Sequence, residues 1–351
     1  MMMKLQIGAT GSSPAYLRPE TCQNIFLDFL RIYKNSRQSL PLGIAQAGAS
    51  FRNEIAPKQT LLRERELGQM EIEIFFDPQK QDEVEKFNEV ENYKLNLETL
   101  KEGKMLKVAC KEAVERKIVS CRLAAYSLAR LQQFYEKLGI PNEAMRFREL
   151  DSQTRAFYAR ETWDFEVLCE GKWVELVACN NRTDYDLSQH AKESRQSLSV
   201  KEEGREFVPH VFELSAGIDR TFYAVICHAL KKEIRGPEER TFLSLNSSIA
   251  PYFVSVFPLV KKDGLFEKAG EIHKEIASWN LDTFFDEKGS IGKRYARMDE
   301  LGVPFAVTVD YDTMKDGTVT LRQRDTLEQK RVKVEELPLM LMKLLNGKME
   351  F

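Results

Sequence analysis

The sequence predicts two domains, an α+β domain built on an antiparallel sheet and a following α/β domain with a mixed sheet. Residues 70–75 alternate between polar and apolar side chains, which indicates a strand with two unlike faces. Residues 157–169 and 172–179 have strand-like composition on either side of the turn Glu170-Gly171, as expected for an antiparallel pair. After residue 250, strand-like and helix-like segments alternate, which favours a parallel or mixed sheet with right-handed crossovers.

The first domain is expected over residues 1–240. A helix is predicted from about Pro19, since proline suits a first helical turn. The apolar stripe of this helix consists of Ile25, Phe26, Phe29 and Ile32. Residues 42–56 and 69–76 are then predicted to form strands.

A helical region is expected at about residues 80–150 of this domain. Within it, residues 105–138 carry apolar side chains at helical spacing and are predicted to form a long helical stretch that breaks into two helices. The strand pair at 157–179 follows, and then a short strand at 208–212. Residues 218–230 form an apolar helix, which we expect to belong to the core.

The second domain is expected over residues 250–351. Gly236, Pro237 and the polar run 244–248 interrupt the preceding pattern and mark the boundary at 236–250. Its predicted strands are 252–260, 283–286, 305–310 and 318–322. Its predicted helices are 265–279, 291–301 and 334–345.

Composition excludes several classes of protein. The 351 residues are 43% hydrophobic and 30% charged, with a formal net charge of -2, so no global charge draws the chain to nucleic acid or to a membrane. No apolar run approaches the roughly 20 residues of a membrane span. The six cysteines are scattered without a C-x-x-C pair, which fits a reducing cytoplasm rather than disulfides or a zinc site.

The most informative segment is 51–78. Arg52 and Glu54 lie in its first extended part, and Glu71 and Glu73 project from one face of its second strand, with Ile72 and Ile74 predicted to face a core. A basic loop with Lys58, Arg63 and Arg65 joins the two parts. Such a hairpin suits a ligand that is anionic at one end and cationic at the other, as an amino acid meeting ATP would be.

Each of these features also has a plainer interpretation. Arg52 and Glu54 could form an exposed ion pair, and alternating carboxylates such as Glu71 and Glu73 most often mark a solvated sheet face. Residues 289–295 are not a phosphate-binding P-loop, because arginine follows Gly292-Lys293 where that motif needs Ser or Thr. The four histidines form no H-E-x-x-H set. The functional interpretation therefore depends on several motifs occurring together in order.

Several segments occur in one characteristic order. They are Arg18-Pro19-Glu20-Thr21, Phe51-Arg52-Asn53-Glu54, Glu71-Ile72-Glu73, residues 182–187, 217–220 and 289–295, and Asp316 to Arg322 followed by Arg324-Asp325. In order and spacing the chain resembles glycyl-tRNA synthetase of the class II, archaeal and eukaryotic kind, from about residue 5 to the C-terminus. The resemblance implies a class II synthetase-like catalytic domain followed by an anticodon-binding-like domain. It also implies glycine, ATP and tRNA(Gly) as substrates.

The resemblance implies an ATP site. Arg52 matches the arginine with which family members contact the α-phosphate of ATP. Its planar guanidinium group would stabilise the charge that builds as the glycine carboxylate attacks phosphorus. Arg220 matches the arginine on the γ-phosphate, and Glu175 matches the carboxylate that carries ATP with its Mg2+. The full expected set of ATP-binding residues is Arg52, Asn53, Glu54 (on adenine), Arg63, Glu64, Glu175, Leu176 and Arg220, with Arg52 and Arg220 catalytic.

The resemblance also implies a glycine pocket. Glycine has no side chain to grip, so selectivity must come from its ammonium group and from exclusion of larger ligands. The expected pocket residues are Glu20, Glu71, Arg182, Glu213 and Ser215. Activation needs no nucleophilic side chain, because the carboxylate of glycine itself attacks ATP.

The chain departs from the family pattern at its start. The family carries a long segment ahead of Arg18-Pro19-Glu20, containing motif 1, which builds the dimer interface, and here Met1 falls inside the catalytic domain. Three explanations remain open: a split gene with a separate N-terminal partner polypeptide, a fragment or misassigned start, and a paralogue without aminoacylation. There are also smaller departures. Leu214 stands where the family usually has proline, and Asn180-Asn181 replaces a pair of the Ala-Asp type. The insertion that the family commonly carries before motif 3 is reduced to residues 192–207.

We expect an aminoacylating enzyme that acts with an N-terminal partner polypeptide or as a homodimer. We expect no association with a membrane. The alternative is a non-catalytic paralogue that binds tRNA or assists subunit assembly through its second domain. Its candidate phosphate contacts are Lys261, Lys262, Lys293, Arg294 and Arg297, which could equally be surface charges.

Overall fold

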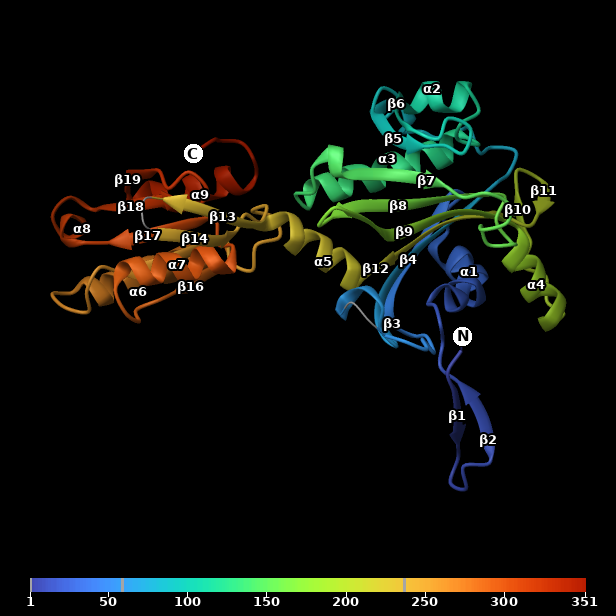
Figure 1. The fold of residues 1–351 in the computed structure, drawn as a ribbon, viewed down its shortest axis with the longest axis horizontal. Helices are drawn as coiled ribbons and strands as arrows, with labels where there is room; N and C mark the ends of the chain where they lie inside the picture. The colour runs from blue at the N-terminus through green and yellow to red at the C-terminus, as the bar shows by residue number, and fades with distance from the viewer. Residues whose placement is uncertain (1, 58–59, 236–237) are drawn as a thin grey trace. The chain divides into compact units, whose positions relative to one another are not determined.

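The computed structural model describes residues 2–57, 60–235 and 238–351 (Figure 1). Lys58 of the expected basic loop, and Gly236 and Pro237 of the expected boundary, lie outside the described residues. The chain divides into two compact units, residues 1–136 with 140–224, and residues 137–139 with 225–351. Each unit is described separately below.

An eight-stranded sheet organises the first unit. Its strand order is β3-β4-β12-β9-β8-β7-β5-β6, and every neighbouring pair is antiparallel except β5 with β7. The strands are β3 (Leu42–Phe51), β4 (Glu66–Phe76), β5 (Lys94–Glu98), β6 (Met105–Ala109), β7 (Met145–Glu149), β8 (Glu161–Cys169), β9 (Lys172–Thr183) and β12 (His210–Gly217). The predicted antiparallel sheet is confirmed, as is the turn Glu170-Gly171, where both residues have positive φ.

Helices cover both faces of this sheet. On one face, α1 (Cys22–Ser36) packs Phe29 against Phe75 of β4, with ring centroids 4.1 Å apart. On the other face, α3 (Arg122–Lys137) packs Tyr135 against Phe165 of β8 at 4.7 Å. Burial of these aromatic side chains stabilises the packing of both helices on the sheet.

The alternation along β4 is present, but its burial is the reverse of the prediction. Glu71 and Glu73 are 1% and 0% exposed, whereas Ile72 and Ile74 are only partly buried. The carboxylates share the face of Phe75, which α1 covers. The expectation that the isoleucines alone would face the core was therefore wrong, as was the plainer interpretation of a solvated carboxylate face.

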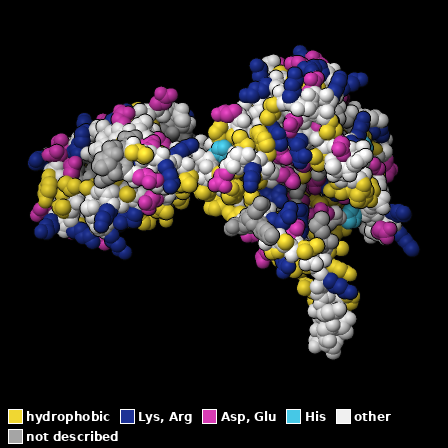
Figure 2. All heavy atoms as spheres, in the orientation of Figure 1, with side chains coloured by type: hydrophobic (Ala, Val, Ile, Leu, Met, Phe, Trp, Pro, Cys, Tyr) yellow, Lys and Arg dark blue, Asp and Glu magenta, His cyan; other side chains and the backbone are white. Residues whose placement is uncertain are grey.

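The helix expected from about Pro19 begins at Cys22. Thr21 occupies the N-cap position but makes no capping bond, because its hydroxyl donates to Glu71 instead. The residues ahead of it form a hairpin of β1 (Lys4–Ile7) and β2 (Ser13–Tyr16) that leaves the body of the unit. Figure 2 shows apolar side chains on the part of this hairpin nearest the body and few at its tip.

The helical region expected at 80–150 contains strands as well. Residues 105–109 form β6, because they pair with β5, and helical structure starts only at α2 (Cys110–Glu115). Helix α3 follows after a break in which Lys117 has positive φ. Here strand pairing overrides a helical spacing that the isolated sequence favours.

Helix α5 (Ile218–Ala229) confirms the predicted helix but not its expected core position. Ile218 and Phe222 are 39% and 59% exposed, and Ala224 is buried. The remaining helix and strands of this unit are α4 (Tyr185–Ser194), β10 (Val200–Glu202) and β11 (Arg205–Phe207). Single 3-10 turns are Thr60–Leu62, Phe87–Glu89, Asn142–Ala144 and, in the second unit, Val334–Glu336.

The second unit contains a five-stranded sheet of order β16-β15-β17-β18-β19, and the expectation of a mixed sheet is confirmed. Its strands are β15 (Val254–Pro258), β16 (Thr283–Phe285), β17 (Phe305–Val309), β18 (Thr318–Gln323) and β19 (Gln329–Lys333). Its helices are α6 (Leu265–Ser278), α7 (Ile291–Leu301), α8 (Tyr311–Asp316) and α9 (Leu337–Leu345). The prediction missed α8, β19 and a hairpin of β13 (Leu230–Arg235) and β14 (Glu238–Leu243).

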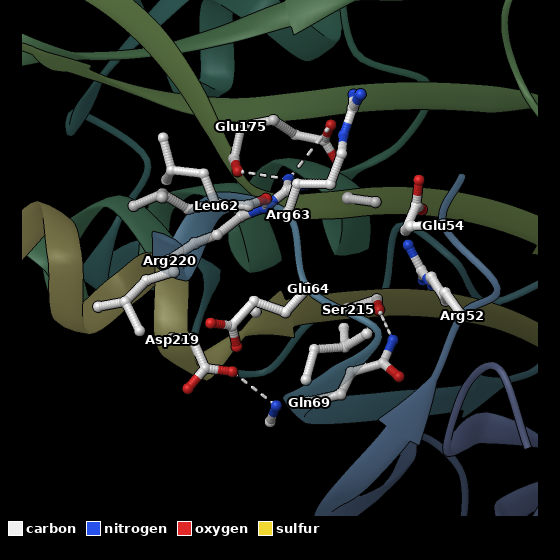
Figure 3. A pocket seen from close by; sticks show the side chains of 16 residues that line it. Arg52, Glu54, Leu62, Arg63, Glu64, Gln69, Glu175, Ser215, Asp219 and Arg220 are labelled. Carbon is white, nitrogen blue, oxygen red and sulfur yellow. Dashed lines mark hydrogen bonds and ion pairs between the residues drawn. The ribbon is translucent and has the colours of Figure 1, made fainter. Parts of the chain in front are cut away.

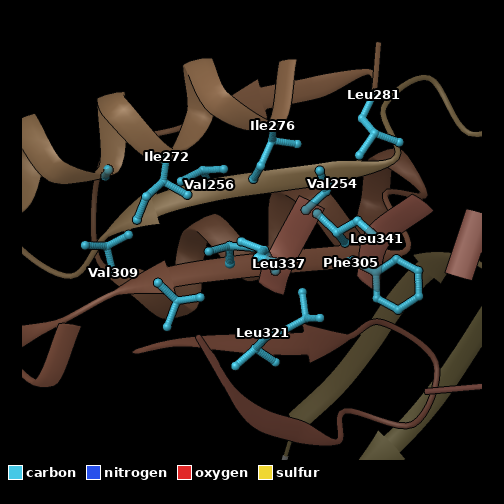
Figure 4. Packing of buried hydrophobic residues seen from close by; sticks show 14 of the residues in the cluster. Val254, Val256, Ile272, Ile276, Leu281, Phe305, Val309, Leu321, Leu337 and Leu341 are labelled. Atoms are coloured by element: carbon cyan, nitrogen blue, oxygen red, sulfur yellow. The ribbon is translucent and has the colours of Figure 1, made fainter. Parts of the chain in front are cut away.

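The core of the second unit lies between α6, α9 and the sheet (Figure 4). Ile272 and Ile276 of α6 and Leu337 and Leu341 of α9 are buried against the valines of β15 and β17. The three parallel strands β16, β15 and β17 have near-continuous apolar runs, as expected for strands covered on both faces.

No helix of the described ranges has both the length and the apolar character that crossing a membrane requires.

A buried ionic cluster joins three elements of the second unit, and its centre is Asp299 of α7. The Asp299 carboxylate accepts two bonds from Arg322 of β18, at 2.9 and 2.8 Å, and further bonds from Arg240 of β14. We expect Asp299→Asn to destabilise this unit by roughly 3–5 kcal/mol, because Arg322 loses its buried counter-ion, while Arg240 keeps a pair with Glu233 at 3.4 Å. Hydrogen exchange of the backbone amides in α7 and β18 measures the effect.

Asp312→Asn is the matched control, since Asp312 pairs with Lys315 at an exposed position of the same unit. Its expected effect is below about 0.5 kcal/mol. Equal protection of the α7 amides in both variants would contradict a structural role for the Asp299 cluster.

Candidate functional site

The main candidate site is a cavity of about 180 Å³ in the first unit (Figure 3). It opens over β4, β9 and β12, between the loop that joins β3 to β4 and the first turn of α5. Its lining residues are Arg52, Glu54, Leu61, Leu62, Arg63, Glu64, Leu67, Gly68, Gln69, Glu175, Leu176, Ala178, Ser215, Gly217, Asp219 and Arg220. All the expected ATP-binding residues except Asn53, which is exposed, are in this set.

Arg220 is held in place by main-chain oxygens. Its Nε donates to the carbonyl of Leu62 at 3.2 Å, and its Nη1 donates to the carbonyl of Glu175 at 2.9 Å. The Glu175 carboxylate lies 3.6 Å from the same Nη1 (Figure 3). Because Arg220 stands in the first turn of α5, its charge adds to the positive end of that helix.

Arg52 directly follows β3 at the other side of the cavity. Its Nε donates to the carbonyl of Pro19 at 3.3 Å, and its backbone N–H donates to the carbonyl of Arg65 at 2.9 Å. Within the described ranges, no carboxylate lies at ion-pair distance from Arg52. The guanidinium group therefore has donors available for an anionic ligand in the cavity.

Gly68 and Asp219 join β4 to α5 beneath the cavity. The backbone N–H of Gly68 donates to the Asp219 carboxylate at 2.6 Å. A Cβ at Gly68 would lie 3.2 Å from Ile218 and 3.3 Å from that carboxylate, so a larger residue would require these side chains to shift by a few tenths of an ångström. Neither residue was among the predicted site residues, although both belong to recognised segments of the sequence.

Gln69 links the cavity to a buried group of carboxylates. Its Nε2 donates to Glu71 at 2.7 Å and to the Ser215 hydroxyl at 2.8 Å, and its Oε1 accepts from Ser50 at 2.6 Å. Ser215 in turn donates to Glu71 at 2.9 Å. Gln69 was missed, but the period-two alternation that singled out Glu71 places it on the same face.

The carboxylates of Glu71 and Glu213 meet the thiol of Cys22, with ligand-type atoms of all three within 4.8 Å of one another. Thr21 donates to Glu71, and Asn180 donates to Glu213 at 2.6 Å. Burial, assisted by the charge of Glu71, raises the pKa of Cys22, so its sulfur stays a neutral thiol. Both carboxylates already accept bonds from neutral donors, and their remaining lone pairs could accept hydrogen bonds from a small organic cation.

Arg182 is the cation of this cluster, and its guanidinium group already donates hydrogen bonds to carboxylates of the protein. Its Nη1 donates to Glu213 at 2.8 Å, and its Nε and Nη2 donate to Asp186 at 2.6 and 2.7 Å. The one guanidinium pairs with two of the three buried carboxyl groups of this cluster, those of Glu213 and Asp186, and not with Glu71. Burial raises the pKa of Glu213, and a bound ammonium group would add a second cation to these three carboxyl groups.

Two aromatic rings enclose Arg182. Its Cζ lies 4.0 Å from the ring centroid of Tyr158 and 5.3 Å from that of Phe26. Burial and the charge of Glu213 raise the pKa of Tyr158 to about 12, so its hydroxyl stays protonated. Glu20 lies at the edge of the cluster, where its carboxylate accepts a bond from Gln23 at 2.9 Å.

Glu73 differs from Glu71, although both lie on one face of β4. Neither carboxylate oxygen of Glu73 has a hydrogen-bond partner within the described part of the chain. Burial, with the charge of Glu213 opposite it in β12, raises the pKa of Glu73 well above its ordinary value. Glu73 is therefore a neutral acid in the folded state over a range of pH in which the unfolded chain is ionised.

This difference predicts that Glu73→Met stabilises the protein. Because the folded-state pKa is raised, wild-type stability falls as the pH rises above about 4.5, where the unfolded chain loses its proton. We expect the variant to gain roughly 1–3 kcal/mol in free energy of unfolding at pH 8 and less at pH 4.5. Denaturant unfolding at both pH values measures this. A loss of stability at pH 8 would show that Glu73 is ionised and bonded.

Glu175 has the properties of a magnesium ligand shared with a bound nucleotide. Its carboxylate is about half exposed in the cavity and provides hard oxygen donors, which suit Mg2+. Burial and the charge of Glu175 raise the pKa of the neighbouring Asp164 to about 7. Asp164 and Glu166 are already paired with Arg148 and, for Glu166, Arg146, so Glu175 is the accessible donor of this group.

Two protein families match the chain. Residues 9–229 match the tRNA synthetase class II core domain of the G, H, P, S and T enzymes. Residues 254–344 match an anticodon binding domain. These two matches, on an antiparallel sheet with a cavity that three arginines line and on a following mixed-sheet domain, define a class II aminoacyl-tRNA synthetase.

Curated relatives narrow the family further. The chain is 35% identical to a glycine–tRNA ligase of Thermococcus kodakarensis over 98% of its length and 74% of the relative. It is 37% identical to one of Pyrococcus horikoshii over 99% of its length and 75% of the relative. The chain belongs to the glycine–tRNA ligase family. The alignments span 427 and 429 positions, more than the 351 residues present, so these relatives carry additional internal segments.

Proposed function

We propose that this protein is a glycine–tRNA ligase, which activates glycine with ATP and transfers it to tRNA(Gly). One observation carries the proposal: two unlike sites meet on one face of the sheet. Ser215 and Gln69 line the cavity that contains Arg52, Arg63 and Arg220, and both also bond to Glu71 of the buried carboxylate cluster. A nucleotide in the first site and an ammonium group in the second would place an amino-acid carboxylate between them.

The first step needs positioning and charge stabilisation. A glycine carboxylate oxygen attacks the α-phosphorus of ATP, and the bond from that phosphorus to pyrophosphate breaks. Arg52 would hold the α-phosphate, and Arg220 would hold the γ-phosphate. Their fixed guanidinium groups would stabilise the charge that develops at phosphorus. Mg2+ bound with ATP would be held by Glu175 and would neutralise phosphate charge.

The proposed glycine pocket recognises its ligand by charge and by size. Glu71 and Glu213 would accept hydrogen bonds from the ammonium group, while Arg182 keeps Glu213 in place. Cys22 and Thr21 are almost fully buried beside these carboxylates. A ligand with a side chain would have to displace packed atoms, and close-packed interiors resist such insertion.

A partner segment is part of the proposal. Strand β3 forms one edge of the eight-stranded sheet and is ten residues long. An edge of this length with free main-chain groups favours pairing with another strand. We propose that an N-terminal polypeptide or a second copy of the chain supplies it.

The second unit is proposed to contact tRNA. Of the five cationic candidates in its sequence, Arg294 is buried and donates to the carbonyls of Pro258 and Gly289. Arg297 pairs with Asp286, and Lys261 pairs with Glu287. Lys262 and Lys293 are exposed and are the better candidates for phosphate contacts. The six free cysteines support a reducing compartment, for which we propose the cytoplasm.

Glycine-dependent exchange of pyrophosphate into ATP tests the proposal, first with this chain alone and then with a candidate N-terminal segment. Charging of tRNA(Gly) is measured with the same preparations. Exchange that requires glycine supports the ligase. A folded chain that binds tRNA without exchange in either arrangement would instead be the non-catalytic paralogue.

A further inference from the structure

The wall of the proposed glycine pocket continues to the protein surface through aromatic rings. Tyr158 covers Arg182, which is paired with Glu213. Phe157 packs against Tyr158 with ring centroids 5.3 Å apart, and against Tyr185 of α4 at 5.5 Å. Both contacts are edge-to-face, with interplanar angles of 73° and 87°. A single ring therefore separates Phe157 from the buried ionic cluster.

Phe157 itself is 84% exposed. A single exposed apolar side chain is common and carries no meaning alone. This ring, however, belongs to a group of three aromatic side chains at the pocket wall. Its two neighbours hold it in place, and most of its surface remains open to a ligand.

The loop around Phe157 is cationic. Arg155 and Arg160 flank the ring, and Arg155 donates to the carbonyl of Arg160 at 2.5 Å. Across the described ranges, neither guanidinium has a carboxylate at ion-pair distance. The start of the loop is fixed because the Asp151 carboxylate accepts the backbone N–H groups of Gln153 and Thr154, both at 2.8 Å.

An exposed aromatic ring with two flanking arginines suits a single-stranded nucleic-acid end. Bases stack on aromatic side chains in a way that tolerates any sequence, and arginines bind the phosphates beside them. A protein partner would find a small apolar surface and two uncompensated charges here, which is a poor interface core.

We propose that Phe157 is the stacking platform for the base at the 3′ end of tRNA, with Arg155 and Arg160 beside its phosphates. The inference rests on the proposed function, because the terminal ribose must reach glycine that is activated next to Glu71 and Glu213. The inference names residues that would bind the 3′ end of tRNA, for which the proposed ATP and glycine sites provide no contact.

A double cycle between the protein and the RNA tests this. Affinity is measured for wild type and Phe157→Ala, each with intact tRNA(Gly) and with tRNA(Gly) lacking its 3′-terminal nucleotide. We expect the variant to bind intact tRNA roughly 5- to 100-fold more weakly and the shortened tRNA equally well, since stacking contributes on that scale. Phe157→Trp should restore binding of the intact tRNA.

Leu100→Ala is the matched control, since Leu100 is an exposed apolar residue (55%) that follows β5 at the far end of the sheet. It should bind both RNAs as wild type does. Rates of glycine-dependent exchange and of single-turnover transfer, measured alongside, separate activation from tRNA positioning. We expect Phe157→Ala to lower the transfer rate at subsaturating tRNA more than the exchange rate.

Several results would overturn the inference. If Phe157→Ala bound both RNAs more weakly by the same factor, or bound both as wild type does, the terminal base would not stack on Phe157. A changed sedimentation coefficient of the variant would indicate a protein interface instead. If wild type charges tRNA and only the Phe157 effect is absent, the inference fails and the ligase stands. If wild type shows no exchange and no tRNA binding, both fail together.

Discussion

Arg52→Ala should reduce glycine-dependent ATP–pyrophosphate exchange about 1,000-fold. The side chain is positioned by the carbonyl of Pro19, and no carboxylate of the described residues occupies its remaining donors. Loss of a fixed donor that stabilises developing charge typically costs 100- to 1,000-fold, and arginine supplies more than one such donor. The effect should fall mainly on kcat, because the charge at phosphorus develops only in the transition state.

Arg52→Lys distinguishes geometry from charge. Lysine retains the positive charge but lacks the planar fork, so we expect exchange to stay at least about 100-fold below wild type. Arg116→Ala serves as a control, because Arg116 forms an exposed pair with Glu112 away from the cavity. If the exchange rate of Arg52→Ala lay within tenfold of the rate of Arg116→Ala, Arg52 would not be a phosphate-binding residue.

Glu71→Gln should raise the KM for glycine roughly 30- to 4,000-fold in the same assay. The Glu71 carboxylate is buried and accepts bonds from Thr21, Gln69 and Ser215. Its replacement by an amide removes one negative charge from the proposed ammonium site. Loss of one partner of a buried charge pair costs about 2–5 kcal/mol, which corresponds to that range.

Glu73→Met is the matched comparison, because Glu73 lies two residues further along the same face of β4 and has no hydrogen-bond partner in the described chain. Its KM for glycine should stay within about threefold of wild type. The KM for ATP should change little in either variant. A large rise in glycine KM for Glu73→Met, with normal Glu71→Gln kinetics, would place the ammonium group deeper in the sheet than we propose.

Much of the architecture could be predicted from local patterns. The turn Glu170-Gly171 was recognisable because glycine suits the positive φ of a tight turn. Helix α7 at 291–301 was recognisable because its apolar period and flanking glycines are local signals. The mixed sheet of the second unit followed from the alternation of apolar runs with amphipathic helices. These features depend on residues near one another in the chain.

The errors have a common cause. Residues 105–109 have helical spacing but form β6, because β5 offers a hydrogen-bonding edge beside them. The helix expected from about Pro19 starts at Cys22, and the hydroxyl of its N-cap residue Thr21 bonds to Glu71, which is 50 residues away in the chain. Strand β19 and the β13–β14 hairpin were missed, since their pairing stabilises them more than their local sequence does.

The candidate site shows the same division. The sequence alone determined which side chains carry charge, and the order of its segments identified the family and half of the residues that line the cavity. Only the tertiary structure decided that Glu71 and Glu73 are buried rather than solvated, that Arg182 is already paired with Asp186 and Glu213, and that Gln69 joins the two sites. The physical reason is that charge and periodicity are properties of one segment. Burial and hydrogen-bond partners arise only when β4, β9, β12 and α1 come together.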